Sequence, residues 1–128
     1  MSGAGPFEAG ALLLAAGMLG ATMLPLDPFA DRRSAGTERA AEAVLRGIGE
    51  RQALRLDTAG RYAPFGPAPA ERDAALPGLD LGPTADLFHV EAWEDEGGAF
   101  RLRAVTRPEA IRRGVATPLL REVELPRR

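Results

Sequence analysis

The pattern of hydrophobic and polar positions divides the chain into an apolar N-terminal segment, an amphipathic middle segment, and a C-terminal part in which hydrophobic and polar residues alternate. Residues 9–26 contain no ionisable side chain. As a helix this segment would be about 27 Å long, close to the thickness of the hydrocarbon core of a bilayer. The pattern therefore predicts an N-terminal segment over residues 1–8 and a transmembrane helix over residues 9–26.

Two other interpretations of the apolar segment stay open. A cleaved secretory signal needs a basic region before its apolar stretch, and nothing basic precedes Glu8. A buried core helix would need cover on all sides, and the rest of the chain offers little sequence for it. A retained membrane helix is the working hypothesis.

Prolines interrupt the helical pattern after the apolar segment. Pro25 removes a backbone donor and clashes with the preceding turn, so the helix is expected to bend or loosen there. Pro28 repeats the disturbance. We therefore expect a kinked connection over residues 27–36.

An amphipathic helix is predicted from Thr37 to about Gly60. Thr37 is the expected N-cap, and Glu38 lies in the first turn, where the helix dipole favours a carboxylate. Apolar positions recur at three- and four-residue steps and form one stripe, while charged residues cover the other side. The stripe consists of Ala41, Val44, Leu45, Ile48, Gln52 and Leu56.

The second half of the chain changes to strand patterns. Residues 64–83 are rich in proline and glycine and predict an irregular connection, with a short turn of helix at 70–75. Three alternating runs follow at 87–93, 99–105 and 118–125, with Arg121 the one charged residue on the apolar face of the last run. A loop of five residues makes the first two runs a hairpin.

These elements predict an α+β fold for residues 37–128. The economical arrangement is a three- to four-stranded antiparallel sheet packed on the amphipathic half of one long N-terminal helix, whose other half lies in the membrane.

Composition argues against catalysis. The net charge is -2, all basic residues are arginine, and there is no cysteine. His89 is the sole histidine, in a predicted strand, and the acidic residues 94–96 lie in a predicted turn without the spacing of a calcium loop. The sequence thus predicts no enzyme, no catalytic residue, no cofactor, no metal and no small-molecule substrate.

Arginines near the C-terminus are candidates for a basic patch. Because no aromatic residues are interleaved with them, we expect no nucleic-acid binding. An acidic partner subunit or lipid headgroups are alternative targets. The residues are Arg101, Arg103, Arg107, Arg112 and Arg113.

The stretch "AEAVLRGIGERQALRLDTAGRYAP", residues 41–64, is similar to the end of the long helix in type IV pilins and type II secretion pseudopilins. Asp57, Gly60, Arg61 and Tyr62 match the family's D-x-G-R-Y-P element, with one alanine inserted before the proline. The family also carries a glutamate five residues after the glycine at which it is cleaved, and often a proline further on.

Gly3, Glu8 and Pro25 satisfy these two spacings. The resemblance implies processing after Gly3 and pairing of the Glu8 carboxylate with a neighbour's N-terminal amine, while Pro25 lets the helix soften as subunits pack. Ala4 stands where the family usually has phenylalanine. The alternative for Glu8 is a headgroup-region residue that marks the end of the membrane span.

Small residues cluster within the apolar segment. Ala16 with Gly20, and Gly17 with Ala21, form two overlapping small-xxx-small pairs. Such a face lets another helix approach closely in lipid. The expected partners are therefore transmembrane helices of the same or different subunits, together with the lipid bilayer.

Two opposing signals bear on which side of the membrane the globular domain lies. Arg32, Arg33 and Arg39 follow the apolar segment, which favours a cytoplasmic domain. The pilin resemblance implies a domain outside the cytoplasm, in the periplasm of a bacterium, and we expect that placement.

The expected function is that of a membrane-anchored, pilin-like structural subunit of a larger assembly. The alternative is a single-pass accessory subunit of a multi-subunit membrane complex, for instance an energy-transducing one, that reuses a pilin-like fold. A third, weaker hypothesis is a soluble periplasmic binding domain behind a signal sequence.

Overall fold

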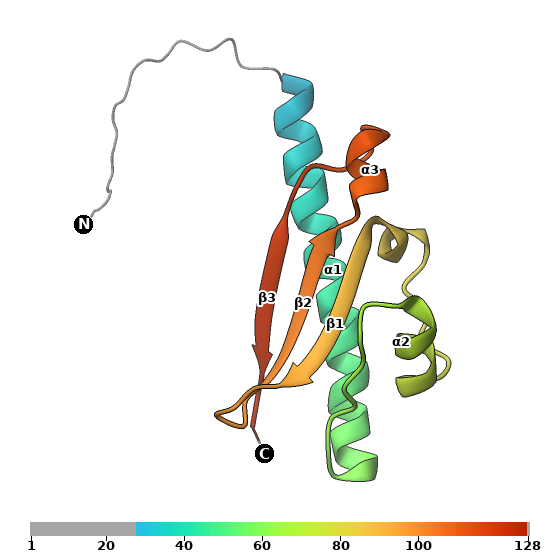
Figure 1. Cartoon of the computed structure of the whole chain (residues 1–128), viewed down its shortest axis with the longest axis vertical. Coiled ribbons are helices and arrows are strands. Elements are labelled where there is room, and N and C mark those ends of the chain that lie inside the picture. The colour runs from blue at the N-terminus through green and yellow to red at the C-terminus, as the bar shows by residue number, and fades with distance from the viewer. Residues whose placement is uncertain (1–27, 128) are drawn as a thin grey trace, which may run out of the picture. The chain divides into compact units, whose positions relative to one another are not determined.

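The computed structural model describes residues 28–127, which form an α+β fold. One long helix, α1 (Pro28–Ala59), precedes three strands, β1 (Phe88–Glu94), β2 (Phe100–Thr106) and β3 (Leu120–Leu125). The strands form an antiparallel sheet in the order β1-β2-β3, with α1 along one face (Figure 1). The predicted long helix and antiparallel meander are confirmed, with three strands.

The chain divides into two units between Asp31 and Arg32, and the sheet belongs to the second. Among residues 28–127, no helix combines the length and apolar character that a membrane crossing requires. The predicted membrane helix at 9–26 lies outside the described residues.

The predicted kinked connection at 27–36 is wrong from Pro28 onward, because α1 is helical from there. A proline at the start of a helix costs nothing, since its missing N–H would have no intrahelical partner. Asp31 lies in the first turn, where the dipole favours an acidic group.

Thr37 is not an N-cap, because it lies within α1 and is buried. Its hydroxyl donates to the carbonyl of Arg33 at 2.8 Å and accepts the backbone N–H of Thr117 at 3.0 Å. The side chain therefore ties α1 to the segment that leads into β3.

The apolar stripe of α1 packs on the inner face of the sheet, as its spacing predicts. All of its members are buried except Leu56, which is half-buried. The inner face of β1 and β2 completes the core with Phe88, Val90, Ala92, Phe100, Leu102 and Ala104.

Gly60 ends the helix near the predicted position. Its φ of +81° is in the left-handed region that favours glycine, and its N–H donates to the carbonyl of Leu56. The chain then turns back toward the sheet, where Phe65 forms a two-way backbone bridge with Ala92 at the edge of β1.

Three short helical elements follow, each with proline in its first turn. The predicted turn of helix at 70–75 is confirmed as α2 (Pro69–Ala75). The 3-10 helix η1 (Pro83–Leu87) and the helix α3 (Pro108–Arg112) were not predicted, because elements this short carry no periodic pattern.

Arg121 lies on the inner face of β3 at the sheet edge, where the sequence predicts apolar residues. Its Nη1 contacts Glu42 Oε2 of α1 at 3.2 Å, and both side chains are partly exposed. An inward-pointing charge on an edge strand also discourages pairing with other strands.

Candidate functional site

The residues that the sequence predicts for processing and assembly lie outside the described residues. They are Gly3, Glu8, Ala16, Gly17, Gly20, Ala21 and Pro25. Their predicted roles stay predictions.

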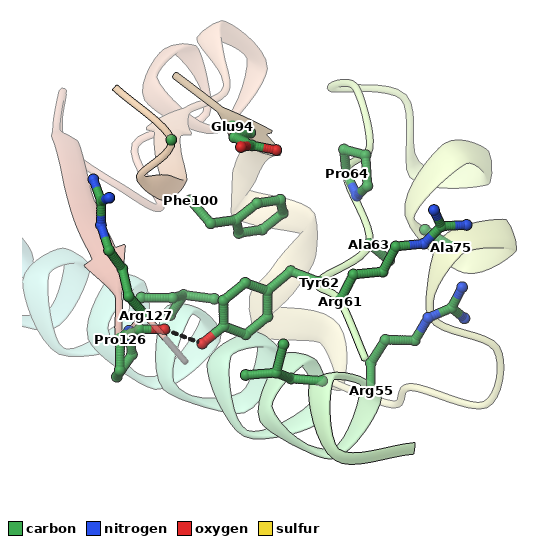
Figure 2. A pocket seen from close by; sticks show the side chains of 13 residues that line it. Arg55, Arg61, Tyr62, Ala63, Pro64, Ala75, Glu94, Phe100, Pro126 and Arg127 are labelled. Carbon is green, nitrogen blue, oxygen red and sulfur yellow. Dashed lines mark hydrogen bonds between the residues drawn. The ribbon is translucent and has the colours of Figure 1, made fainter. Parts of the chain in front are cut away.

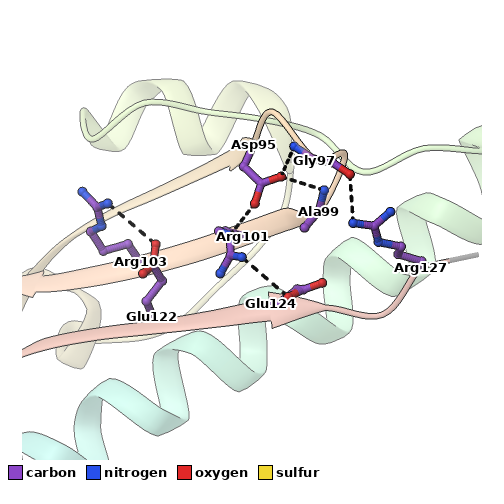
Figure 3. A network of polar contacts seen from close by, with 8 residues as sticks. All are labelled: Asp95, Gly97, Ala99, Arg101, Arg103, Glu122, Glu124 and Arg127. Atoms are coloured by element: carbon purple, nitrogen blue, oxygen red, sulfur yellow. Dashed lines mark hydrogen bonds and ion pairs between the residues drawn. The ribbon is translucent and has the colours of Figure 1, made fainter.

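Asp95, in the predicted acidic turn, organises the β1–β2 hairpin. Its Oδ1 accepts the N–H groups of Gly97 and Ala99, each at 2.9 Å, and its Oδ2 accepts Arg101 Nε at 2.7 Å (Figure 3). The hydrogen bond from Arg101 is the main cause that holds the pKa of Asp95 below its ordinary value, and the hydrogen bond from the backbone N–H of Ala99 is the second. The same hydrogen bond raises the pKa of Arg101.

Both carboxylate oxygens of Asp95 accept hydrogen bonds from the hairpin, so this side chain stabilises the turn. Among residues 28–127 no cluster of three potential metal-ligating side chains occurs.

The outer face of the sheet carries alternating charges across the strands. Arg103 lies 3.5 Å from Glu91. It also lies 3.7 Å from Glu122, and Arg101 lies 3.7 Å from Glu124 (Figure 3). The Arg103 guanidinium also stacks 4.7 Å from the centre of the Trp93 ring.

The hypothesis of one basic patch near the C-terminus is therefore wrong. Arg101 and Arg103 are paired with carboxylates on the outer face, and Arg107 donates from Nε to the carbonyl of Phe88. Arg112 and Arg113 are exposed at the end of α3.

His89 lies on the outer face of β1 opposite Val105, as the alternation predicts. The residue is half-buried, and its covered Nδ1 has no hydrogen-bond partner among residues 28–127.

The described part of the chain has a groove of about 730 Å³, which we call the arginine groove. It lies where the C-terminal end of α1, the segment after it, the β1–β2 hairpin and the C-terminal tail meet (Figure 2). Its lining residues are Arg55, Leu56, Arg61, Tyr62, Ala63, Pro64, Ala75, Glu94, Gly98, Phe100, Leu125, Pro126 and Arg127.

Apolar side chains form the middle of the groove. The Tyr62 and Phe100 rings contact each other with centroids 4.9 Å apart, and the Tyr62 hydroxyl donates to the carbonyl of Pro126. The Gln52 side chain exchanges two hydrogen bonds with the backbone of Ala63. These contacts hold the segment after α1 against the sheet and give the groove a defined wall.

Cationic side chains mark two sides of the groove. Figure 2 shows the Arg55 and Arg61 side chains extending in the same direction on the side of the groove where Ala75 lies, with Arg127 on the opposite side. Arg127 donates from Nη2 to the carbonyl of Gly97 at 3.0 Å. The one acidic side chain in the lining is Glu94.

Sequence reasoning identified Arg61 and Tyr62 only through the pilin-like element and missed the groove. Its arginines come from positions 55, 61 and 127, which no local pattern brings together. The chain matches no known protein family, and neither the curated proteins nor the solved structures include a match to it.

Proposed function

We propose that this chain is a membrane-anchored structural subunit, of pilin or pseudopilin type, that packs through its N-terminal apolar segment in a larger assembly. The main support is the N-terminal part of α1, which the other described residues leave exposed to solvent. Residues 31–35 are helical and exposed, Thr37 is the first buried residue from residue 31 onward, and the stripe that packs on the sheet begins at Ala41.

A helical end that the described residues do not cover gains little stability by itself, because isolated short helices are marginal in water. It is stabilised when the helix continues upstream or when another element packs on it. The predicted membrane helix at 9–26 lies just upstream, and the proposed assembly supplies neighbouring helices.

The layout of the domain also supports the proposal. A long helix whose far half packs on an antiparallel sheet is the arrangement that the pilin resemblance implies. The residues that match the family's helix-end element have a corresponding role here, since Gly60 ends α1 and Tyr62 contacts the sheet through Phe100.

In the proposed assembly, Glu8 pairs with the N-terminal amine of a neighbouring subunit, and the faces with Ala16, Gly17, Gly20 and Ala21 allow close helix packing. The domain from Thr37 onward lies outside the cytoplasm.

The test is an intact-mass measurement of the chain extracted in mild detergent, with identification of the proteins that remain bound. Loss of residues 1–3 together with pilin-like partners supports the proposal. A full-length chain held among subunits of an unrelated membrane complex would favour the accessory-subunit alternative. A monodisperse chain in buffer without detergent would contradict both.

The role of Glu8 has its own test. Glu8→Gln keeps the size of the side chain and removes its charge, so assembly should fail while membrane insertion persists. The matched control is Glu38→Gln on the exposed side of α1, which should assemble normally. Normal assembly of Glu8→Gln would contradict the pairing.

Topology is testable because the natural chain has no cysteine. A single Ala43→Cys substitution, at an exposed position of α1, should react in whole cells with a thiol reagent that does not cross the inner membrane. Reaction only after cell lysis would place the domain in the cytoplasm.

A further inference from the structure

We propose that the arginine groove binds an acidic peptide segment of a partner protein, with carboxylates at Arg55 and Arg61 and an apolar side chain over Tyr62 and Phe100. This goes beyond the structural role proposed above, because it assigns a recognition site to the far end of the domain.

The first observation is the unbalanced charge of the groove. Three arginines line it against one carboxylate, that of Glu94. Within residues 28–127 the Arg55 and Arg61 side chains have no carboxylate in ion-pair range, whereas Arg101, Arg103 and Arg121 all do. Two guanidinium groups on one side of a concavity repel each other and attract an anion.

The second observation is an unused donor. Arg55 Nε is covered by the surrounding protein and has no acceptor in the described residues. A buried donor without an acceptor is unfavourable, and a small rotation of the side chain would present its planar fork to a carboxylate. Arg55 is therefore not committed to a structural contact.

The third observation is the apolar middle of the groove. The Tyr62 and Phe100 rings lie between the two arginine sides (Figure 2). Leu56, Leu125 and Pro126 also line the groove. A cavity of about 730 Å³ is of the size that holds a drug-sized ligand or several residues of peptide. An inorganic anion would fill only a small part of it.

A lipid headgroup of the anchoring membrane fits the arginine groove less well than an acidic peptide does. Arg55 is about 35 Å along α1 from Arg32, near the C-terminal end of the helix, whereas the apolar segment precedes its N-terminal end in the sequence. An acidic, partly apolar peptide satisfies both the charge of the rim and the aromatic middle.

The experiment uses the full chain in dodecyl maltoside micelles and a fluorescein-labelled hexapeptide of alternating glutamate and phenylalanine, followed by fluorescence anisotropy. The comparison peptides carry glutamine in place of glutamate, or alanine in place of phenylalanine. We expect the parent peptide to bind at least tenfold more tightly than either. Equal binding of all three would overturn the proposal.

The variant is Arg55→Gln with Arg61→Gln, and the matched control is Arg39→Gln with Arg46→Gln on the exposed side of the same helix. Both doubles remove two positive charges. The groove variant should lose tenfold or more in affinity and the control less than twofold. Equal loss in both would show a general charge effect and overturn the proposal.

Two further measurements keep the outcome clear. If the groove double variant fails to fold by circular dichroism, Arg61→Gln alone replaces it, because Arg61 is exposed. Sodium phosphate should displace the peptide no better than sodium chloride at equal ionic strength. Specific displacement by phosphate would replace the peptide site with a simple anion site.

Discussion

Gln52 of α1 and Ala63 of the following segment are joined by a reciprocal pair of hydrogen bonds in the core. Gln52 Nε2 donates to the Ala63 carbonyl at 2.7 Å, and Gln52 Oε1 accepts the Ala63 N–H at 2.8 Å. The Gln52 side chain is fully buried. The polar side chain of Gln52, within the apolar stripe, thus holds the segment that leads from α1 to the sheet.

Replacing Gln52 with alanine should destabilise the fold by about 3 kcal/mol. The loss combines a cavity with two buried backbone groups of Ala63 that no longer have partners. Urea unfolding followed by circular dichroism measures it. Glu50→Ala, at an exposed position of the same helix, should change the free energy of unfolding by less than about 0.5 kcal/mol. Similar values for the two variants would contradict the role of Gln52.

Thr37 provides a second test of a polar contact in the core. Thr37→Val keeps the shape but removes the acceptor of the Thr117 N–H, so the free energy of unfolding should fall by about 1–2 kcal/mol. Thr37→Ser keeps the hydroxyl and should lose clearly less. If serine and valine are equally destabilising, the hydroxyl contact does not matter.

The sequence predicts those parts of the fold in which one buried face makes hydrophobic residues recur at regular spacing. The stripe of α1 follows the helical period because it packs on the sheet, and Phe88, Val90 and Ala92 alternate because β1 is covered on one face. Residues 31–35 carry no such signal because they are exposed, and the prolines nearby therefore predict a kink where the structure has a helix.

The predicted N-cap role of Thr37 is wrong for a related reason. A threonine before a charged residue is typical of an N-cap, and only the position of Thr117 shows why the hydroxyl is needed inside the helix. The sequence does not reveal the groove, because only tertiary folding brings Arg55 and Arg127 to opposite sides of it. The sequence shows Arg121 as the one charged residue on the apolar face of its strand. It does not show the ion pair of Arg121 with Glu42, because Glu42 lies on α1, far away in the sequence.

The hairpin should contribute to the acid sensitivity of the fold through Asp95. Since folding lowers the pKa of Asp95, its stabilising contribution is present above the pKa of the unfolded chain, about 4, and is lost as the pH falls through the lower folded value. Asp95→Asn removes this titration. The free energy of unfolding should therefore fall less steeply below about pH 4 in the variant than in the natural chain.

Urea midpoints at pH 7, 4, 3 and 2.5 measure that slope. Glu96→Gln is the matched control, because Glu96 is an exposed carboxylate in the same turn. Its slope should stay close to that of the natural chain. A slope unchanged by Asp95→Asn would show that the Arg101 contact does not persist in solution.

The last prediction concerns the C-terminal tail, which two contacts hold beside the groove. The Tyr62 hydroxyl donates to the Pro126 carbonyl, and Arg127 donates to the Gly97 carbonyl at the hairpin. Tyr62→Phe keeps the ring contact with Phe100 and removes only the hydroxyl, so it should cost about 1 kcal/mol.

Because both contacts order the same tail, loss of one should weaken the other. In a double-mutant cycle, Tyr62→Phe and Arg127→Gln should show a coupling free energy of at least about 0.5 kcal/mol. Tyr62→Phe and Glu50→Ala share no partner and should be additive within error. Additivity in both cycles would mean that the tail is held at two independent points, and that the groove wall formed by Pro126 does not depend on Arg127.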